Sequence, residues 1–309
     1  MSDEAELVRE SAPNPQGRRH LALSASRASD YKTCPLLYRF RAVDKLPEPP
    51  SPEAARGTLV HAVLEDLFGL PATERTEGAA VDLVRPTWER LSGEIPEWPT
   101  MFGPDQLDTW LESARDRVRT YFSLEDPTGF SAESRELLLE VEVGDGVPLR
   151  GYLDRVDVAP NGALRIVDYK TGRAPSELFE QSALFQMKFY ALLVLRTRGV
   201  VPHQLKLLYL GDSRWLTYVP SEDELVSFER TLTPLWSAML LARRTGDFRP
   251  RPGKMCGWCA HHARCPEFGG TPPPYPFPDE SDPVGEAAGD TTRPDAVDAA
   301  PPDRMAGVR

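Results

Sequence analysis

Residues 149–170 read LRGYLDRVDVAPNGALRIVDYK, and this stretch decides the fold. Two runs of alternating and β-branched residues, 149–158 and 163–170, predict two strands. The loop between them is Pro160, Asn161 and Gly162. A three-residue loop with proline first and glycine last suits a type I turn closed by a left-handed residue. The stretch therefore predicts an antiparallel hairpin.

The three-residue loop also fixes which residues face each other across the hairpin. Asp157 should lie opposite Arg165 as a favourable cross-strand pair on one face. On the other face Asp154 should lie opposite Asp168. Because strand side chains alternate with a period of two, Lys170 shares the face of Asp168. The register thus gathers two carboxylates and an ammonium group on one face.

Such a group of charges predicts a site for a divalent metal. Two facing carboxylates about 5 Å apart repel each other unless a cation or a proton intervenes. Mg²⁺ is commonly held by one or two carboxylates together with substrate phosphate oxygens. A neighbouring lysine can orient or activate the attacking water, or neutralise charge on a phosphate. On the preceding strand, whichever of Glu140 and Glu142 faces inward is expected to support the site. The alternative is a solvated rim of charges at the end of the hairpin.

The flanking segments complete an α/β chain. Their periodicity predicts helices at 54–70, 80–92, 105–124, 177–198 and 221–244, and further strands at 137–143, 204–210 and 214–219. An ordered body over 20–270 would then contain a helical insert (46–130), a sheet core (137–220) and a cysteine-rich segment (245–268). Residues 1–19 and 271–309 are polar, with proline and acidic residues, and are predicted to be disordered tails.

Charge and hydropathy narrow the class of protein. The chain has 309 residues and a formal net charge of −11. The predicted tail at 271–309 contributes −5 of this charge, and the predicted tail at 1–19 contributes −1. No apolar run approaches the roughly 20 residues that a membrane span needs. The N-terminal residues are acidic where a signal peptide would be basic and then apolar. We therefore expect a cytoplasmic protein that makes no use of a membrane.

The four cysteines form a second group of candidate ligands. Cys256, Cys259 and Cys265 lie close together near the C-terminus, and Cys34 precedes them by more than 200 residues. Four cysteines are too few to form the disulfide scaffold of a chain of this length. Three cysteines at this close spacing indicate a site for a soft metal ion or a metal cluster. The residues leave two arrangements open. Four thiolates can hold a [4Fe–4S] cluster, or zinc can bind the three cysteines with either Cys34 or His262.

The cysteine segments are also basic. Residues 18–45 hold seven bases and two acids, and residues 240–266 hold six bases and one acid. Aromatic residues are interleaved with them, namely Tyr31, Tyr38, Phe40, Phe248 and Trp258. Basic residues with interleaved aromatics are typical of a groove that follows a nucleic-acid strand and stacks its bases. A solvated basic surface is the alternative.

Taken together, the motifs resemble the PD-(D/E)XK nuclease superfamily, and specifically the RecB-type exonucleases. GYLDRVD followed by IVDYKTG matches their D-x13-D-x-K pattern. RGTLVH at 56–61 resembles a helix carrying a histidine metal ligand, and QMKFY at 186–190 resembles the QxxxY motif. LSASRASDYKTCPLLYRF at 23–40 resembles the N-terminal cysteine segment. The resemblance spans about 21–268.

This resemblance implies a restriction-endonuclease-like mixed β-sheet flanked by helices, and a DNA exonuclease that uses Mg²⁺ or Mn²⁺. The implied metal ligands are His61, Asp154, Asp168 and the backbone carbonyl of Tyr169. The implied catalytic residues are Asp154, Asp168, Lys170, Gln186 and Tyr190. Lys170 would orient or deprotonate the attacking water, and Gln186 and Tyr190 would position the Lys170 region or a DNA phosphate.

The resemblance also favours the cluster over zinc. Iron–sulfur members of the family, including the AddB subunit and the CRISPR-associated exonucleases, share the arrangement of one early and three late cysteines. A [4Fe–4S] cluster is therefore expected on Cys34, Cys256, Cys259 and Cys265. The implied substrate is DNA, as a single strand or a duplex end, in repair or recombination. The chain has no Walker A loop, so a helicase would be a separate partner. A catalytically silent DNA-binding or assembly module with the same fold is the alternative, against which the intact Asp, Asp and Lys set argues.

Overall fold

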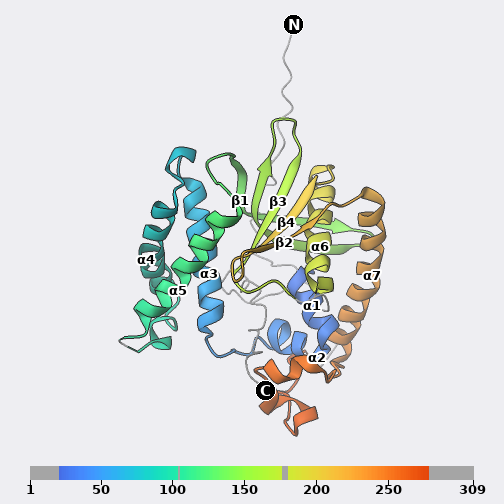
Figure 1. Cartoon of the computed structure of the whole chain (residues 1–309). Coiled ribbons are helices and arrows are strands. Elements are labelled where there is room, and N and C mark those ends of the chain that lie inside the picture. The colour runs from blue at the N-terminus through green and yellow to red at the C-terminus, as the bar shows by residue number, and fades with distance from the viewer. Residues whose placement is uncertain (1–20, 104, 176–179, 278–309) are drawn as a thin grey trace, which may run out of the picture.

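A mixed five-stranded sheet forms the centre of the molecule (Figure 1). The computed structural model describes residues 21–103, 105–175 and 180–277. The strands are β1 (Ala132–Val143), β2 (Val147–Val158), β3 (Leu164–Lys170), β4 (Gln204–Tyr209) and β5 (Arg214–Tyr218). They follow one another across the sheet in sequence order, and every neighbouring pair is antiparallel except β3 and β4. The expected α/β class with a mixed sheet is confirmed.

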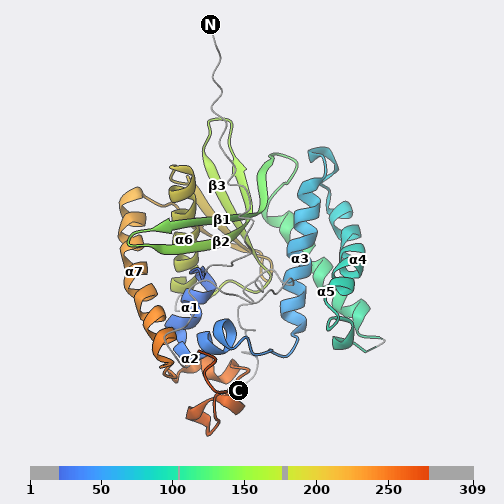
Figure 2. The same cartoon turned by 180° about the vertical axis from the view of Figure 1, so that it is seen from behind.

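Helices cover both faces of this sheet. They are α1 (Ala25–Thr33), α2 (Pro35–Tyr38), α3 (Pro52–Gly69), α4 (Glu77–Glu94), α5 (Leu107–Leu124), α6 (Glu180–Arg198) and α7 (Glu222–Thr245). Figure 2 shows α3, α4 and α5 on one side of the sheet, with α1, α6 and α7 on the other. The predicted helices at 54–70, 80–92 and 105–124 correspond to α3, α4 and α5. Within the described residues, no helix is both long enough and apolar enough to cross a membrane.

The starts of three helices follow directly from the sequence. Ser51, Thr76 and Ser221 precede α3, α4 and α7, and each side-chain oxygen accepts a hydrogen bond from the backbone N–H three residues later. Such an N-cap satisfies a backbone donor that the first helical turn leaves without a partner.

The central hairpin has the predicted register. Gly162 closes its loop with a φ of +82°, the left-handed conformation that glycine adopts without steric cost. Across the strands the pairs are Arg155 with Val167, Val156 with Ile166, Asp157 with Arg165, and Val158 with Leu164. The side chains of Asp157 and Arg165 form the expected ion pair, at 2.7 Å.

Alternation along the strands builds a separate hydrophobic core on each face. Ile166 and Leu207 belong to the core beneath α6 and α7, whereas Val167 and Leu208 belong to the core beneath α3, α4 and α5. The central strands of the sheet are thus buried on both faces.

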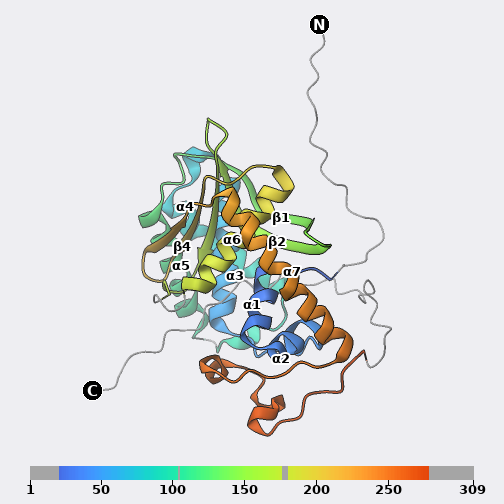
Figure 3. The ribbon, with the colours of Figure 1, turned by 90° about the vertical axis from the view of Figure 1, so that its right-hand side faces the viewer.

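The C-terminal segment returns beneath α2. It contains three short helical turns, Lys254–Trp258, His262–Arg264 and Pro266–Phe268, which Figure 3 shows below α1 and α2. Packing continues past the predicted boundary at residue 270, because Arg39 donates to the Pro273 carbonyl at 2.5 Å and lies over the Tyr275 ring. The predicted tail at 1–19 and residues 278–309 of the second tail lie outside the described residues.

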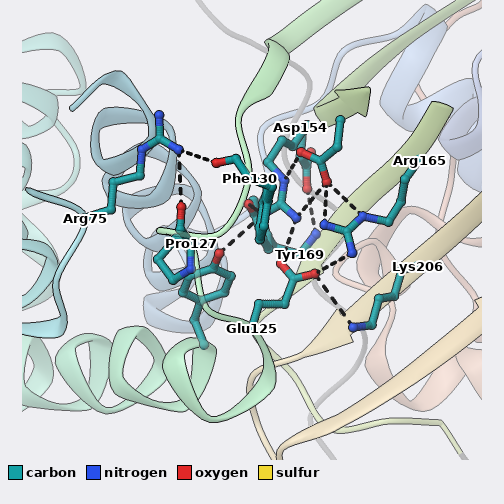
Figure 4. A network of polar contacts seen from close by, with 11 residues as sticks. Arg75, Glu125, Pro127, Phe130, Asp154, Arg165, Tyr169 and Lys206 are labelled. Carbon is teal, nitrogen blue, oxygen red and sulfur yellow. Dashed lines mark hydrogen bonds and ion pairs between the residues drawn. The ribbon is translucent and has the colours of Figure 1, made fainter. Parts of the chain in front are cut away.

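A buried network of charges ties the end of α5 to the sheet (Figure 4). Arg155 is 1% exposed and donates to Glu125 at 2.7 Å and to the Tyr169 hydroxyl at 2.6 Å. Glu125 also contacts Arg165 at 3.3 Å and Lys206 at 3.7 Å. One carboxylate therefore joins cations from β2, β3 and β4 and helps to hold the strand that carries Tyr169.

Glu125→Gln is expected to lower the free energy of unfolding by about 3 kcal/mol, because it leaves Asp157 alone to neutralise Arg155 and Arg165 in a buried network. Urea unfolding followed by circular dichroism measures the change. Glu112→Gln is the matched control, since Glu112 lies on the same helix in exposed ion pairs with Arg115 and Arg119. Equal stability of the two variants would show that the Glu125 network does not hold the sheet.

Candidate active site

The hairpin brings the predicted carboxylates and lysine together where β2 and β3 meet. Lys170 Nζ lies 3.0 Å from Asp168 Oδ2, and both side chains are buried. Asp154 Oδ2 accepts the Tyr169 backbone N–H at 2.7 Å. The contact ties Asp154 to the strand that carries Asp168 and Lys170, as the register predicts.

Helix α3 adds His61 to this group. The imidazole is buried, with Nε2 2.7 Å from the Tyr169 carbonyl oxygen and Nδ1 3.3 Å from Asp154 Oδ2. Gly57, one turn earlier, lies beside the end of β3, since a Cβ there would be in ordinary contact with Thr171 Oγ1 at 3.5 Å. Three of the predicted metal ligands, namely His61, Asp154 and the Tyr169 carbonyl, are thus in mutual contact.

The pair Gln186 and Tyr190 approaches from α6. Gln186 Nε2 donates to Asp168 Oδ1 at 3.3 Å and to the Tyr190 hydroxyl oxygen at 3.1 Å. Residues four apart on a helix share a face, which lets both side chains point at one strand. Gly151 on β2 makes room, since a Cβ there would lie 3.2 Å from the Tyr190 ring. Gln186 therefore contacts Asp168 directly, and Tyr190 is held through Gln186.

Glu136 on β1 is a site residue that the sequence reasoning missed. One ligand atom from each of His61, Glu136 and Asp154 lies within 4.8 Å of the others. Glu140 and Glu142, the residues expected to support the site, are exposed, and Glu140 pairs instead with Arg150. The expectation for Glu140 and Glu142 is wrong because the backbone at Glu136 has a φ of +44°, which interrupts the alternation of β1. The side chain of Glu136 therefore points inward, and those of Glu140 and Glu142 point outward.

The concentrated acidic charge perturbs every group at the site. Burial, reinforced by neighbouring Asp154, raises the pKa of Asp168 to about 6 and that of Glu136 to about 8. Burial opposes ionisation of Asp154, but His61, the Tyr169 N–H and Lys170 together outweigh burial and lower the pKa of Asp154. Burial alone would lower the pKa of His61, yet Asp154 and the other carboxylates raise it to about 9. Without a metal, protons and an imidazolium must balance the carboxylates.

The residues present fit a hard divalent cation. His61 Nδ1 and Asp168 Oδ2 are buried and make no hydrogen bond among the described residues, only a contact with one charged neighbour each. Carboxylate and carbonyl oxygens are the donors that Mg²⁺ and Mn²⁺ prefer, and an imidazole is tolerated by Mn²⁺. A bound cation would also displace the proton that Glu136, with a pKa of about 8, otherwise retains at neutral pH.

Glu136→Gln is expected to weaken Mn²⁺ binding about 10- to 100-fold, the range typical when a group supporting a metal site is lost. Isothermal titration calorimetry with Mn²⁺ measures the affinity directly. Glu140→Gln, with the same change on the exposed face of the same strand, should bind Mn²⁺ like the wild type. Equal affinities for both variants would remove Glu136 from the site.

The four cysteines line one hollow of about 180 Å³ between α2 and the C-terminal segment. Cys34 lies between α1 and α2, and the other three lie on the short turns beyond residue 253. Backbone N–H groups point at two of the sulfurs, from Arg251 to Cys34 at 3.4 Å and from Gly253 to Cys256 at 3.3 Å. Burial raises the pKa of Cys259, and the nearby Cys34 and Cys265 thiols contribute.

The spacing of these sulfurs is wider than that of a zinc site. Sulfurs bound to one zinc at about 2.3 Å are about 3.8 Å apart in a tetrahedron. Among the described residues, the three ligand atoms around His61 are the one set of three that lies within 4.8 Å. His262, the alternative zinc ligand, lines the hollow, but its Nε2 faces the Cys256 carbonyl and its ring stacks on Phe268.

The predicted stacking groove is largely absent from the described surface. Tyr38, Phe40 and Phe248 are at most 5% exposed and belong to the core beneath α6 and α7. Tyr31 is half-buried and packs edge-on against Tyr38, so among the five aromatics Trp258 alone is largely exposed, at 56%. The prediction is wrong because these segments wrap around the sheet, where their aromatic rings serve as core.

Fold and site together define a nuclease with a restriction-endonuclease-like core. The chain belongs to the PD-(D/E)XK nuclease superfamily, whose sequence profile matches residues 22–266. Gene 69 protein of Mycobacterium phage D29 is 32% identical over 199 residues, which cover 57% of this chain and 70% of that protein. Gene 69 protein of Mycobacterium phage L5 is 25% identical over 287 residues, covering 79% and 96%. A crystal structure of an exonuclease candidate from Eubacterium rectale aligns with a TM-score of 0.49 at 13% identity, covering 78% of this chain and 87% of that one.

Proposed function

We propose that this protein is a Mg²⁺- or Mn²⁺-dependent DNA exonuclease of the RecB type, stabilised by a [4Fe–4S] cluster and acting in DNA repair or recombination. The observation that carries the proposal is the meeting of His61, Asp154 and the Tyr169 carbonyl beside the Asp168–Lys170 pair. Such a set matches the needs of metal-assisted phosphodiester hydrolysis.

In this proposal His61, Asp154, Asp168 and the Tyr169 carbonyl hold the cation. The cation, when bound, supplies Lewis-acid stabilisation of the charge that develops on the phosphoryl oxygens. Lys170, held 3.0 Å from Asp168, orients the attacking water as an ammonium group, or takes up the proton of that water once Lys170 has itself lost a proton. Gln186 keeps the Asp168 carboxylate in place by its hydrogen bond at 3.3 Å.

The cluster is proposed for the hollow that all four cysteines line. Two backbone N–H groups donate to Cys34 and Cys256, and hydrogen bonds to ligand sulfurs tune iron–sulfur clusters. The wide spacing of the sulfurs favours a multi-atom cluster over a single zinc ion. Anaerobically purified protein should be brown and contain about four irons per chain. Stoichiometric zinc with no iron would replace the cluster with the zinc arrangement.

The nuclease proposal is tested by incubating the purified protein with end-labelled linear DNA and with circular single-stranded DNA. Mg²⁺ or Mn²⁺ should release nucleotides from the linear substrate, chelation should stop the release, and the circle should resist. Cleavage of the circle would make the protein an endonuclease. Binding without cleavage in either metal would favour the silent DNA-binding module, and we expect any helicase to be a separate protein.

A further inference from the structure

Three arginines from three elements gather beside the catalytic hairpin. Arg56 lies on α3, five residues before His61, which corresponds to about 7.5 Å along the helix axis. Arg117 lies on α5, and Arg173 follows β3 three residues after Lys170. None of the three is among the proposed ligands of the metal site.

Contacts between the elements place these side chains close together. Arg56 Nη1 donates to Ser113 Oγ at 3.3 Å, and Ser113 lies one turn before Arg117 on α5. Gly57 on α3 lies beside Thr171, since a Cβ added at Gly57 would be 3.5 Å from Thr171 Oγ1, and Thr171 is two residues before Arg173. Consistent with this proximity, burial lowers the pKa of Arg117, and the charges of Arg56 and Arg173 lower it further.

The cluster lacks the acids that would neutralise it. The Nε atoms of Arg56 and Arg117 are buried and have no hydrogen-bond partner among the described residues. The acids nearest to Arg117 are Asp116 and Asp212. Each is already in an ion pair with another arginine, Asp116 with Arg119 at 2.9 Å and Asp212 with Arg214 at 3.3 Å. Gathering three cations without a dedicated counter-charge costs stability, and a bound anion would offset that cost.

We propose that Arg56, Arg117 and Arg173 form a phosphate subsite that holds a phosphate of the DNA strand next to the scissile one. The proposal rests on the proposed nuclease function and deepens it. Guanidinium groups match phosphate oxygens with paired N–H donors. The offset of about 7.5 Å along α3 between Arg56 and His61 places the subsite outside the metal site but a short distance from it along a strand. The helical insert thereby contributes, through Arg117, one wall of the path of the substrate.

The test measures DNA binding in a Lys170→Ala background, so that cleavage does not interfere. Arg117→Gln and Arg173→Gln should each weaken binding of a labelled single-stranded oligonucleotide about 10-fold at low salt, and lower the slope of log K against log salt by about 1. Arg85→Gln is the matched control, because it removes the same charge from the insert at an exposed ion pair with Asp108. Thermal unfolding checks that each variant is folded, and Arg173, being exposed, keeps the test open if Arg117→Gln does not fold.

Two forms of the oligonucleotide identify which phosphate is bound. If the subsite holds a terminal phosphate, the Lys170→Ala protein with all three arginines intact should bind a 5′-phosphorylated oligonucleotide more tightly than a 5′-hydroxyl one. The arginine variants should lose that preference. If the subsite holds an internal phosphodiester, the arginine variants should lose affinity equally for both oligonucleotides. Affinity and salt slope unchanged in both Arg117→Gln and Arg173→Gln would overturn the subsite. The binding assay does not depend on cleavage. If the wild-type protein cleaves no DNA but the salt dependence of its binding still requires these arginines, the nuclease proposal fails and the phosphate subsite remains.

Discussion

Asp168→Ala and Lys170→Ala should each lower the rate of DNA cleavage by about 1,000-fold or more while leaving DNA binding nearly unchanged. Asp168 is at once a proposed metal ligand, the partner of Lys170 at 3.0 Å and the acceptor of the Gln186 hydrogen bond. Its loss removes metal occupancy and transition-state charge stabilisation together, and single groups of this kind contribute about 100- to 1,000-fold. Lys170→Ala retains the carboxylates and so should retain the metal.

The two variants can therefore be separated by measuring Mn²⁺ affinity alongside cleavage of labelled DNA. Asp168→Ala should lose both, whereas Lys170→Ala should lose cleavage alone. Lys188→Ala is the matched control, because Lys188 on α6 forms its ion pair with Glu224 of α7. Wild-type rates for Asp154→Ala in Mg²⁺ would contradict the assignment of the site to this hairpin.

Local chemistry explains why the hairpin could be predicted. Pro160, Asn161 and Gly162 specify their own turn, and a turn of known length fixes the register of both strands. Once that register is set, the position of Asp168 relative to Lys170 follows from the two-residue period. N-cap residues such as Ser51 and Thr76 similarly mark the starts of helices within a few residues.

The parts that could not be predicted depend on tertiary structure or on one unusual backbone angle. A count of alternating residues along β1 places Glu136 on the outer face, and its φ of +44° reverses that placement. The burial of Tyr38 and Phe248 depends on how the terminal segments wrap around the sheet. Arg117 lies near enough to Arg173 for their charges to interact, because α5 packs against β3 through Tyr121 and Tyr169, and no local sequence pattern indicates that proximity.

Cys34→Ser is expected to abolish the cluster and destabilise the whole fold. Cys34 and Cys256 are separated by more than 200 residues and line the same hollow, so joint ligation closes nearly the entire ordered chain into one loop. By analogy with a disulfide, closing a loop of this length removes unfolded-chain entropy worth about 5 kcal/mol. The C-terminal turns are short and mostly exposed, so they should become the first site of proteolysis. Iron content, thermal unfolding and limited proteolysis measure these effects.

His262→Ala is the control that separates a cluster from zinc. If the four thiolates hold the cluster, His262→Ala should retain iron and the wild-type unfolding temperature, since His262 contacts only the Cys256 carbonyl and the Phe268 ring among the described residues. Cys34→Ser should also lower cleavage only in proportion to the folded fraction, because the cysteine segments contribute no residue to the Asp168 site. The opposite pattern, in which His262→Ala loses its metal while Cys34→Ser keeps it, would establish a local zinc site. A zinc ion held only by residues 256–265 would close no long loop, and the large loss of stability expected for Cys34→Ser would then have no physical basis.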